Sequence, residues 1–176
     1  KGKNVIAIND NYKIAPWADI LYACDAHWWQ WHKDDQDLIS FKGRKITQNN
    51  GWDKAALDQL ESHHIEQYTS LPNPGLSKDP GKIHQGSNSG IQAINLAFHL
   101  GAKEVYLLGF DMKSDNGKTH WSGDHPNKVF PQFNSVILSF ESVAKDAEQM
   151  GGRIINCIRE TALTCFDRKT LHDVLD

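Results

Sequence analysis

The residue types best suited to proton transfer gather in residues 120–125, which read His-Trp-Ser-Gly-Asp-His. Histidine is the usual general base near neutral pH, and it must lie outside the core to reach a substrate. We therefore predict that His120 or His125 acts as a catalytic base and that Asp124 orients the site. In the structural alternative, Asp124 and His125 stabilise this loop and cap the helix behind it.

The same side chains could bind a metal ion. His120, Asp124 and His125, together with Asp111, would provide nitrogen and oxygen ligands. Loop spacings of this kind do not fix the ligand geometry, in contrast to two histidines one helical turn apart. We therefore predict no metal site.

A run of small polar residues precedes an apolar helical pattern. It consists of Ser87, Asn88, Ser89 and Gly90. Free N–H groups at a helix start bind anions, and a phosphate or ribose can approach them where the side chains are small. An ordinary helix cap is the alternative, because Ser and Asn favour that position. Four small residues exceed what a cap needs, so we predict a ligand-binding segment.

Polar side chains also follow two predicted strands. Asn9 and Asp10 come directly after residues 5–8, and Asp111 comes shortly after residues 105–108. Open α/β sheets bind their ligands at the carboxyl ends of the strands. We therefore expect these three residues to share one ligand-binding edge with the helix start. The alternative is that they cap the turns that follow the strands.

Strands and helices alternate along the chain. Short apolar runs predict strands at residues 5–8, 20–24, 44–47, 65–70, 105–108 and 153–156. Helical spacing predicts helices at residues 26–36, 53–62 and 133–150, and a central helix that stops at Gly101. Two short helical pieces are expected at residues 162–166 and 169–175, and loops at residues 71–85 and 113–128.

This alternation predicts an α/β fold, a single Rossmann-like domain over residues 1–176 with a mostly parallel sheet and helices on both faces. Continuous apolar runs suit strands that are covered on both faces. We therefore expect residues 5–8, 20–24 and 105–108 to be buried central strands. A chain of 176 residues with 39% hydrophobic and 23% charged residues fits one globular domain with a real core.

Charge and cysteine usage exclude several classes of partner. The net charge is −3 and no block of Lys or Arg is long, so we expect no nucleic-acid partner. No apolar run approaches the length of a membrane span, and no signal peptide opens the chain. The three cysteines are odd in number and lack metal spacing, which favours free thiols and a reducing, cytoplasmic location.

Three segments resemble a known enzyme family. They are the Asn-Ser-Gly helix start at residues 88–90, the run Leu-Gly-Ala-Lys-Glu-Val-Tyr-Leu-Leu-Gly-Phe-Asp at residues 100–111, and the terminal pattern over residues 155–166. Together they are similar to the bacterial α-2,3/2,8-sialyltransferase-like family. The chain also resembles the related archaeal 6-hydroxymethylpterin pyrophosphokinase-like proteins and uncharacterised phage proteins with Pro-Trp-Ala-Asp and Gly-Asp-His-Pro motifs.

The resemblance implies roles for several residues. It places a nucleotide-contacting Asn at Asn9 and a base that deprotonates the acceptor hydroxyl nearest His125, with His120 as the second choice. The family begins with a further strand and a Gly-x-Gly-Pro-Ser turn that helps to hold the phosphates. This chain starts at Lys1, directly before what resembles the second strand, so we expect that half of the phosphate cradle to be missing from this sequence.

The expected function is glycosyl transfer from a nucleotide-activated sugar to a glycan acceptor, with no cofactor. Ser89 and Gly90 would hold the phosphate or ribose, and Asp111 would help to orient the site. One alternative is pyrophosphoryl transfer, which would need Mg²⁺ held by carboxylates such as Asp111. The other is a non-catalytic phage protein that retains a nucleotide-binding fold. The fold alone does not distinguish these functions.

Overall fold

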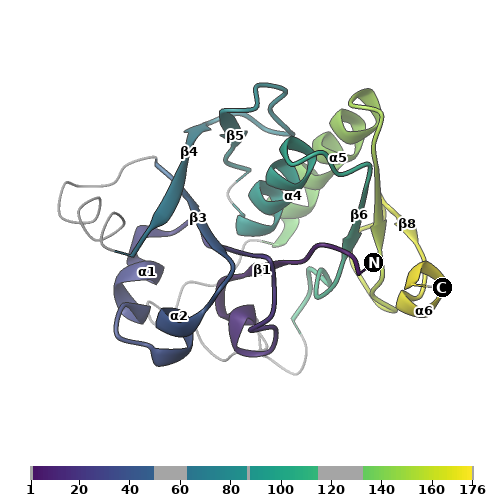
Figure 1. The fold of residues 1–176 in the computed structure, drawn as a ribbon. Helices are drawn as coiled ribbons and strands as arrows, with labels where there is room; N and C mark the ends of the chain where they lie inside the picture. The colour runs from purple at the N-terminus through teal and green to yellow at the C-terminus, as the bar shows by residue number, and fades with distance from the viewer. Residues whose placement is uncertain (1, 50–62, 87, 115–132, 176) are drawn as a thin grey trace.

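The computed structural model describes residues 2–49, 63–86, 88–114 and 133–175 (Figure 1). Five short strands of the N-terminal half form one sheet with neighbours in sequence order: β1 (Ile6–Ile8), β2 (Ile20–Tyr22), β3 (Arg44–Gln48), β4 (Ile65–Leu71) and β5 (Lys82–His84). Every pairing in this sheet is parallel. The carboxyl ends of the five strands therefore lie along a single edge.

A second parallel sheet comes from the C-terminal half. It contains β6 (Glu104–Leu107), β7 (Arg153–Asn156) and β8 (Asp167–Arg168) in that order. The chain before β1 lies beside it, because the Lys3 Nζ atom is 4.9 Å from the centre of the Tyr106 ring. Ile8 of β1 packs against the hydrophobic clusters of both sheets, so the two sheets share core contacts without a shared ladder in the described residues.

Helices cover both faces of the five-stranded sheet. The helices of the described residues are η1 (Asn9–Lys13), α1 (Ala26–His32), α2 (Gln36–Ser40), α4 (Ser89–His99), α5 (Phe133–Gln149) and α6 (Leu171–Leu175), of which α5 packs on β7 and α4, and α6 lies beside β8 (Figure 1). Leu21 of β2 packs in the cluster that contains Trp28 and Trp29 of α1, and its neighbour Tyr22 packs in the cluster that contains Leu96 of α4. The predicted α/β class, with a mostly parallel sheet and helices on both faces, is confirmed.

The central helix α4 carries the segment of greatest functional interest. It contacts both β1 and β5, so the sheet curls around it (Figure 1). Gly101 ends the helix as predicted, with φ at +90°, where a residue with a Cβ atom would be strained. The Ala102 N–H then donates to the Ala97 carbonyl at 3.0 Å, which closes the helix end. The C-terminal end of α4 is therefore closed by the hydrogen bonds of its own backbone.

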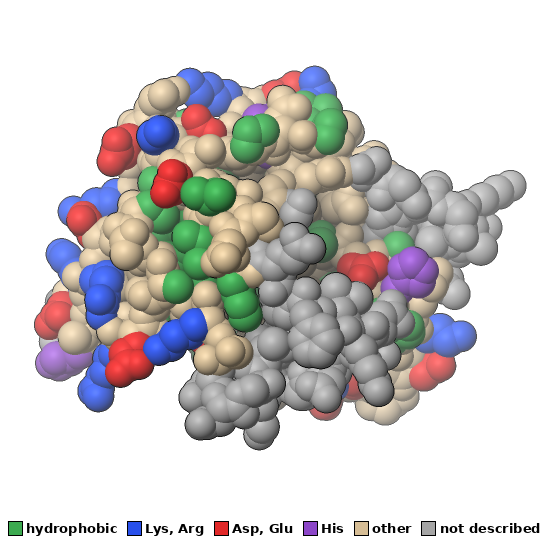
Figure 2. All heavy atoms as spheres, turned by 180° about the vertical axis from the view of Figure 1, so that it is seen from behind, with side chains coloured by type: hydrophobic (Ala, Val, Ile, Leu, Met, Phe, Trp, Pro, Cys, Tyr) green, Lys and Arg blue, Asp and Glu red, His purple; other side chains and the backbone are tan. Residues whose placement is uncertain are grey.

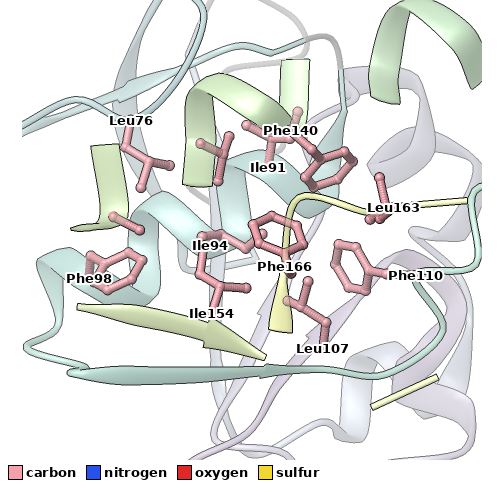
Figure 3. Packing of buried hydrophobic residues seen from close by; sticks show 12 residues of the cluster. Leu76, Ile91, Ile94, Phe98, Leu107, Phe110, Phe140, Ile154, Leu163 and Phe166 are labelled. Carbon is pink, nitrogen blue, oxygen red and sulfur yellow. The ribbon is translucent and has the colours of Figure 1, made fainter. Parts of the chain in front are cut away.

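An aromatic core joins α4, α5 and the second sheet (Figure 3). Phe140 of α5 lies edge-on to Phe110 at 6.0 Å and to Phe166 at 5.8 Å between ring centres. Val143 and Ala147 continue the same buried stripe of α5, the helix that helical spacing predicted at residues 133–150. Phe140 is therefore flanked by two rings, and one of them is Phe110, which follows β6.

Several boundaries differ from the sequence prediction. Residues 105–108 were expected to be a buried central strand, but β6 is an edge strand of its ladder and Leu108 is 55% exposed. β1 also ends its ladder, and only Ala7 of its three residues is fully buried. An apolar run indicates a strand, whereas the number of neighbours depends on pairings that the run does not encode.

Three further predictions about elements were wrong. The expected loop at residues 71–85 contains β5, a strand of three residues that is too short to show a period. The expected helix at residues 26–36 is two helices, because Asp35 caps α2 with its carboxylate. Residues 162–166 form no helix, and their apolar side chains enter the core from irregular backbone. The expected helix at residues 53–62 and most of the polar stretch at residues 113–128 lie outside the described residues.

No helix in the described ranges is long and apolar enough to cross a membrane. On the face opposite to that of Figure 1, acidic and basic side chains of the described residues are interspersed around the rim (Figure 2). Ion pairs join several of the described opposite charges, such as Arg44 with Glu66 and Lys113 with Glu160. The absence of a nucleic-acid partner stays a prediction.

Candidate functional site

Three segments that are distant in sequence meet where β1 and β2 end and α4 begins. The Ser89 Oγ atom lies 3.0 Å from the Cys24 Sγ atom and 3.4 Å from the Asn9 Oδ1 atom. The Cys24 N–H group donates to the same hydroxyl at 3.4 Å. All three residues are half-buried, so this junction is partly open to solvent. The predicted proximity of Asn9 and Ser89 at the carboxyl edge is confirmed.

The Ser89 hydroxyl has one proton to donate and two acceptors within reach. The distance of 3.4 Å to Asn9 is long for an O–H···O hydrogen bond, so Cys24 is the better acceptor by geometry. The Asn9 side chain therefore keeps donor and acceptor capacity for a ligand. It combines an amide and a carbonyl, which suits the edge of a base or a ribose hydroxyl.

Asn9 holds an uncommon backbone conformation. Its φ angle is +51°, in the left-handed region that Asn tolerates better than most residues. This turn begins η1 directly after β1, and the Asn11 side-chain amide donates to the Ile8 carbonyl at 2.9 Å to support it. Strained backbone of this kind gathers at binding sites, where the surrounding structure fixes it.

The helix start serves as a cap, which was the alternative to ligand binding. The Asn88 Oδ1 atom accepts from the Gly90 N–H at 2.7 Å and from the Ile91 N–H at 3.3 Å. These two amides are therefore already satisfied. Gly90 is small for packing, because a Cβ atom there would lie 2.5 Å from the Phe110 ring. A ligand at this edge would meet the side chains of Ser89 and Asn9 rather than these amides.

Asp111 follows the Phe110 ring that abuts Gly90. Thr161 Oγ1 and Asn156 Nδ2 donate to the Phe110 carbonyl at 2.7 Å and 3.1 Å, and the Ala162 N–H donates to the Asp111 carbonyl at 2.8 Å. The chain is thus held firmly where β6 ends. The Asp111 carboxylate is half-buried and has no hydrogen bond or ion pair within the described part of the chain. No measured contact joins it to Asn9 or Ser89.

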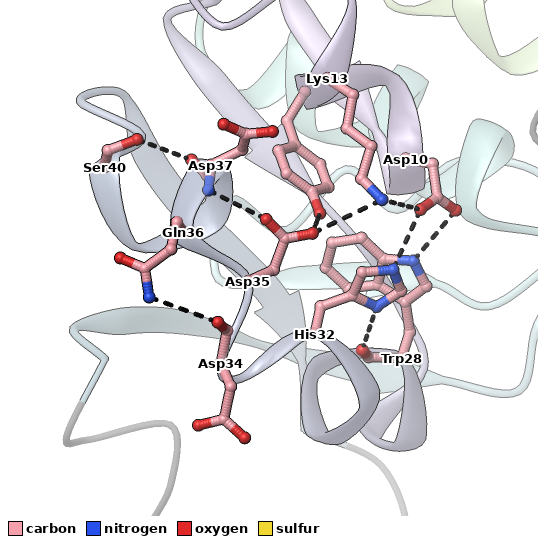
Figure 4. Close-up of polar contacts among 10 residues, drawn as sticks. Asp10, Lys13, Trp28, His32, Asp34, Asp35, Gln36, Asp37 and Ser40 are labelled. Atoms are coloured by element: carbon pink, nitrogen blue, oxygen red, sulfur yellow. Dashed lines mark hydrogen bonds and ion pairs between the residues drawn. The ribbon is translucent and has the colours of Figure 1, made fainter.

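Asp10 takes part in a different arrangement from its neighbour Asn9. Its carboxylate accepts from His32 Nε2 at 3.0 Å and from Trp28 Nε1 at 3.4 Å, and Lys13 Nζ lies 3.8 Å away (Figure 4). The hydrogen bond from His32 holds the pKa of Asp10 below its usual value. These contacts join η1 to α1, so Asp10 has a structural role whether or not it also contacts a ligand.

Sequence reasoning missed this network. The Tyr12 hydroxyl donates to Asp35 at 2.7 Å, and burial raises the pKa of Tyr12 well above its ordinary value. Lys13 Nζ lies 3.5 Å from the same carboxylate. The spacing of Trp28 and His32 by four residues places them on one helix face. That spacing was the signal that the sequence offered. It does not show that η1 packs against α1, which is what brings Asp10 to Trp28 and His32.

An open hollow lies farther along the same carboxyl edge, where β4 and β5 end. It is lined by Pro72, Asn73, Pro74, Gln85, Gly86 and Ser139. None of the predicted ligand residues lines it. It adjoins the start of α4 through Gly86, so it extends the candidate edge toward α5.

Four predicted residues lie outside the described part of the chain: Ser87, His120, Asp124 and His125. Their positions relative to Ser89 and Asp111 therefore stay predictions. Within the described residues, no group of three or more His, Cys, Asp or Glu side chains is arranged to hold a metal ion.

Three comparisons with known proteins identified no relative of this chain. The chain matches no family model, no curated protein and no solved structure.

Proposed function

We propose that this chain binds a nucleotide or a nucleotide-activated sugar at the carboxyl edge formed by β1, β2 and the start of α4. The observation that carries the proposal is the approach of Asn9 Oδ1 and Ser89 Oγ to 3.4 Å at that edge. Open α/β sheets bind nucleotides at such edges, next to a helix start. In this arrangement the Ser89 hydroxyl turns its proton from Cys24 to a phosphate or ribose oxygen of the ligand, and the Asn9 side chain contacts the base or ribose.

The proposed reaction is glycosyl transfer of the sialyltransferase-like type. The acceptor hydroxyl oxygen forms a bond to the anomeric carbon, and the bond between that carbon and the nucleotide phosphate oxygen breaks. His125 takes the acceptor proton, with His120 as the second choice, and the nucleotide leaves with the bonding electrons. A nucleotide is a good leaving group, so the reaction needs positioning and one base rather than a covalent nucleophile.

Asp111 would have a different role in each of the two candidate reactions. Its carboxylate is half-buried at the end of β6 and lacks a charged partner in the described residues, so it can accept a hydrogen bond from a substrate hydroxyl. The same carboxylate could ligate Mg²⁺ in pyrophosphoryl transfer. Dependence of binding on Mg²⁺ separates the two functions.

Calorimetric titration with cytidine, uridine, guanosine and adenosine monophosphates tests the binding step. We expect saturable binding of at least one nucleotide without added Mg²⁺, and displacement of it by the matching nucleotide sugar. Release of free nucleotide from the sugar donor, accelerated by a glycan acceptor, then tests transfer. Binding of ATP alone, and only with Mg²⁺, would favour pyrophosphoryl transfer. No binding of any nucleotide at millimolar concentration would contradict the proposal.

A further inference from the structure

His32 is surrounded by acceptors on both sides of its ring. The Nε2 atom lies 3.0 Å from Asp10 Oδ1, and the Nδ1 atom lies 2.8 Å from the Trp28 carbonyl oxygen (Figure 4). A neutral imidazole carries one N–H and can satisfy only one of these acceptors. The imidazolium form carries two and satisfies both. The geometry therefore selects the protonated ring.

The other groups around His32 fit a positive charge. The Trp28 ring stacks on it with ring centres 4.3 Å apart and an interplanar angle of 23°, which places the cation against an aromatic face. The edge of Tyr12 closes another side at 6.3 Å. Lys13 is the nearby like charge, and its Nζ atom lies between the carboxylates of Asp10 and Asp35. With His32 protonated, two cations face two carboxylates.

This contact determines where Asn9 lies. Asp10 directly follows Asn9, and the pair begins η1 in the strained left-handed turn at Asn9. The bond from His32 fastens η1 to α1 one residue away from the proposed nucleotide contact. We infer that His32, as an imidazolium, is a positioning residue that holds Asn9 in the geometry needed for nucleotide binding. The consequence for ligand affinity rests on the proposed function, whereas the clamp between α1 and η1 does not.

The sign of the pH dependence follows from the same contacts. The hydrogen bond to Asp10 raises the pKa of His32 above its ordinary value of 6.5. The clamp is therefore complete below that value and is lost as the pH rises through the raised pKa of the folded state. The pKa of Asp10 is instead lowered, so the contribution of its carboxylate to the clamp is lost only as the pH falls through that lowered pKa.

Two measurements on the full chain test this inference between about pH 5 and about pH 9. Heteronuclear NMR follows the His32 ring and the Asn9 backbone amide. Calorimetry follows the affinity for the four nucleoside monophosphates. We expect the His32 ring to titrate above its ordinary value and the Asn9 amide to shift with it. Nucleotide affinity should fall about threefold to tenfold over the same transition.

Matched variants separate positioning from general stability. His32→Gln should give weak nucleotide binding without the alkaline transition, because the amide cannot become a cation. His27→Gln, the same change at an exposed histidine of the same helix, should leave both the affinity and the transition as in the parent. Trp28→Phe removes the long indole bond to Asp10 but keeps a stacked ring, so it should retain the transition.

The outcomes separate the two proposals. If no nucleotide binds at any pH, the proposed function fails, and the NMR titration alone decides whether the clamp exists. An Asn9 amide that does not respond while His32 titrates would overturn the clamp. So would an alkaline loss of affinity that persists unchanged in His32→Gln.

Discussion

The Ser89 hydroxyl lies 3.0 Å from the Cys24 sulfur, although the two residues are 65 positions apart in the sequence. This contact fixes the first turn of α4 against the end of β2. The backbone of Cys24 also donates to the same oxygen, so the hydroxyl is held from two directions. The position of Ser89 consequently depends on how α4 packs against the end of β2, and not on the helix alone.

Ser89→Leu should abolish measurable nucleotide binding, a loss of at least about tenfold in affinity, because the larger side chain would fill the space between Cys24 and Asn9 where a phosphate or ribose must approach. Helix propensity changes little, so α4 should still form. Calorimetric titration with the nucleoside monophosphates is the measurement. Ser40→Leu at the exposed end of α2 is the matched control and should bind as the parent does. Equal affinity in parent and Ser89→Leu would remove Ser89 from the site.

Gly90→Ala should destabilise the fold by about 1–2 kcal/mol, even though Ala is the better helix former. The new Cβ atom would lie 2.5 Å from a carbon of the Phe110 ring, which also packs edge-on against Phe140. Denaturant titration gives the change in the free energy of unfolding. Gly81→Ala is the control, because its Cβ atom would have no neighbour closer than 3.6 Å. A stable Gly90→Ala protein would show that the Phe110 ring moves aside at little cost.

The sequence predicted the strands and helices well where they are long or strongly apolar. Residues 133–150 show a clear helical stripe, and α5 follows it closely. The polar residues at strand ends were also found, because parallel strands bring their carboxyl ends to one edge whatever their order. Asn9 and Ser89 therefore met as expected.

What the sequence could not supply is long-range pairing. The run at residues 105–108 does not reveal that, among the described strands, β6 pairs with β7 alone, since each pairing depends on residues far along the chain. The partners of Asp10 were missed for the same reason: His32 and Trp28 come from α1, and the fold of η1 brings them together. The sequence also did not show which small residues at the start of α4 have a structural role: Asn88 caps the helix and Gly90 makes room for Phe110, whereas ligand binding by this segment stays a prediction.

Thr161→Val should cost about 1–3 kcal/mol of stability, because it leaves the Phe110 carbonyl without its shorter donor and the Leu163 N–H without an acceptor. The end of β6 should loosen, which hydrogen exchange at Asp111 and Met112 would show as faster exchange. Thr164→Val, three residues later at an exposed position, should change neither quantity. Unchanged exchange in Thr161→Val would mean that Asn156 alone holds this turn.

His125→Ala should lower turnover by roughly two to four orders of magnitude with little change in nucleotide affinity, because a general base acts in the transition state. In the parent, the rate should rise with pH through the pKa of the base, since the neutral imidazole is the active form. Steady-state rates across pH, with nucleotide affinity measured alongside, check both statements. His120→Ala is the matched comparison. A full defect in His120→Ala and none in His125→Ala would transfer the role to His120.

The order of strands in the larger sheet matches their order of synthesis. Each strand from β2 to β5 pairs with the strand made just before it, so no strand must wait for a partner that has not yet left the ribosome. The sheet can therefore grow by addition at one side, with β1 as the template. The helix α4 is made after all five strands, and it contacts both the first and the last of them. This packing places Ser89 beside Asn9, so the proposed nucleotide site forms only when α4 has packed against the first and last strands.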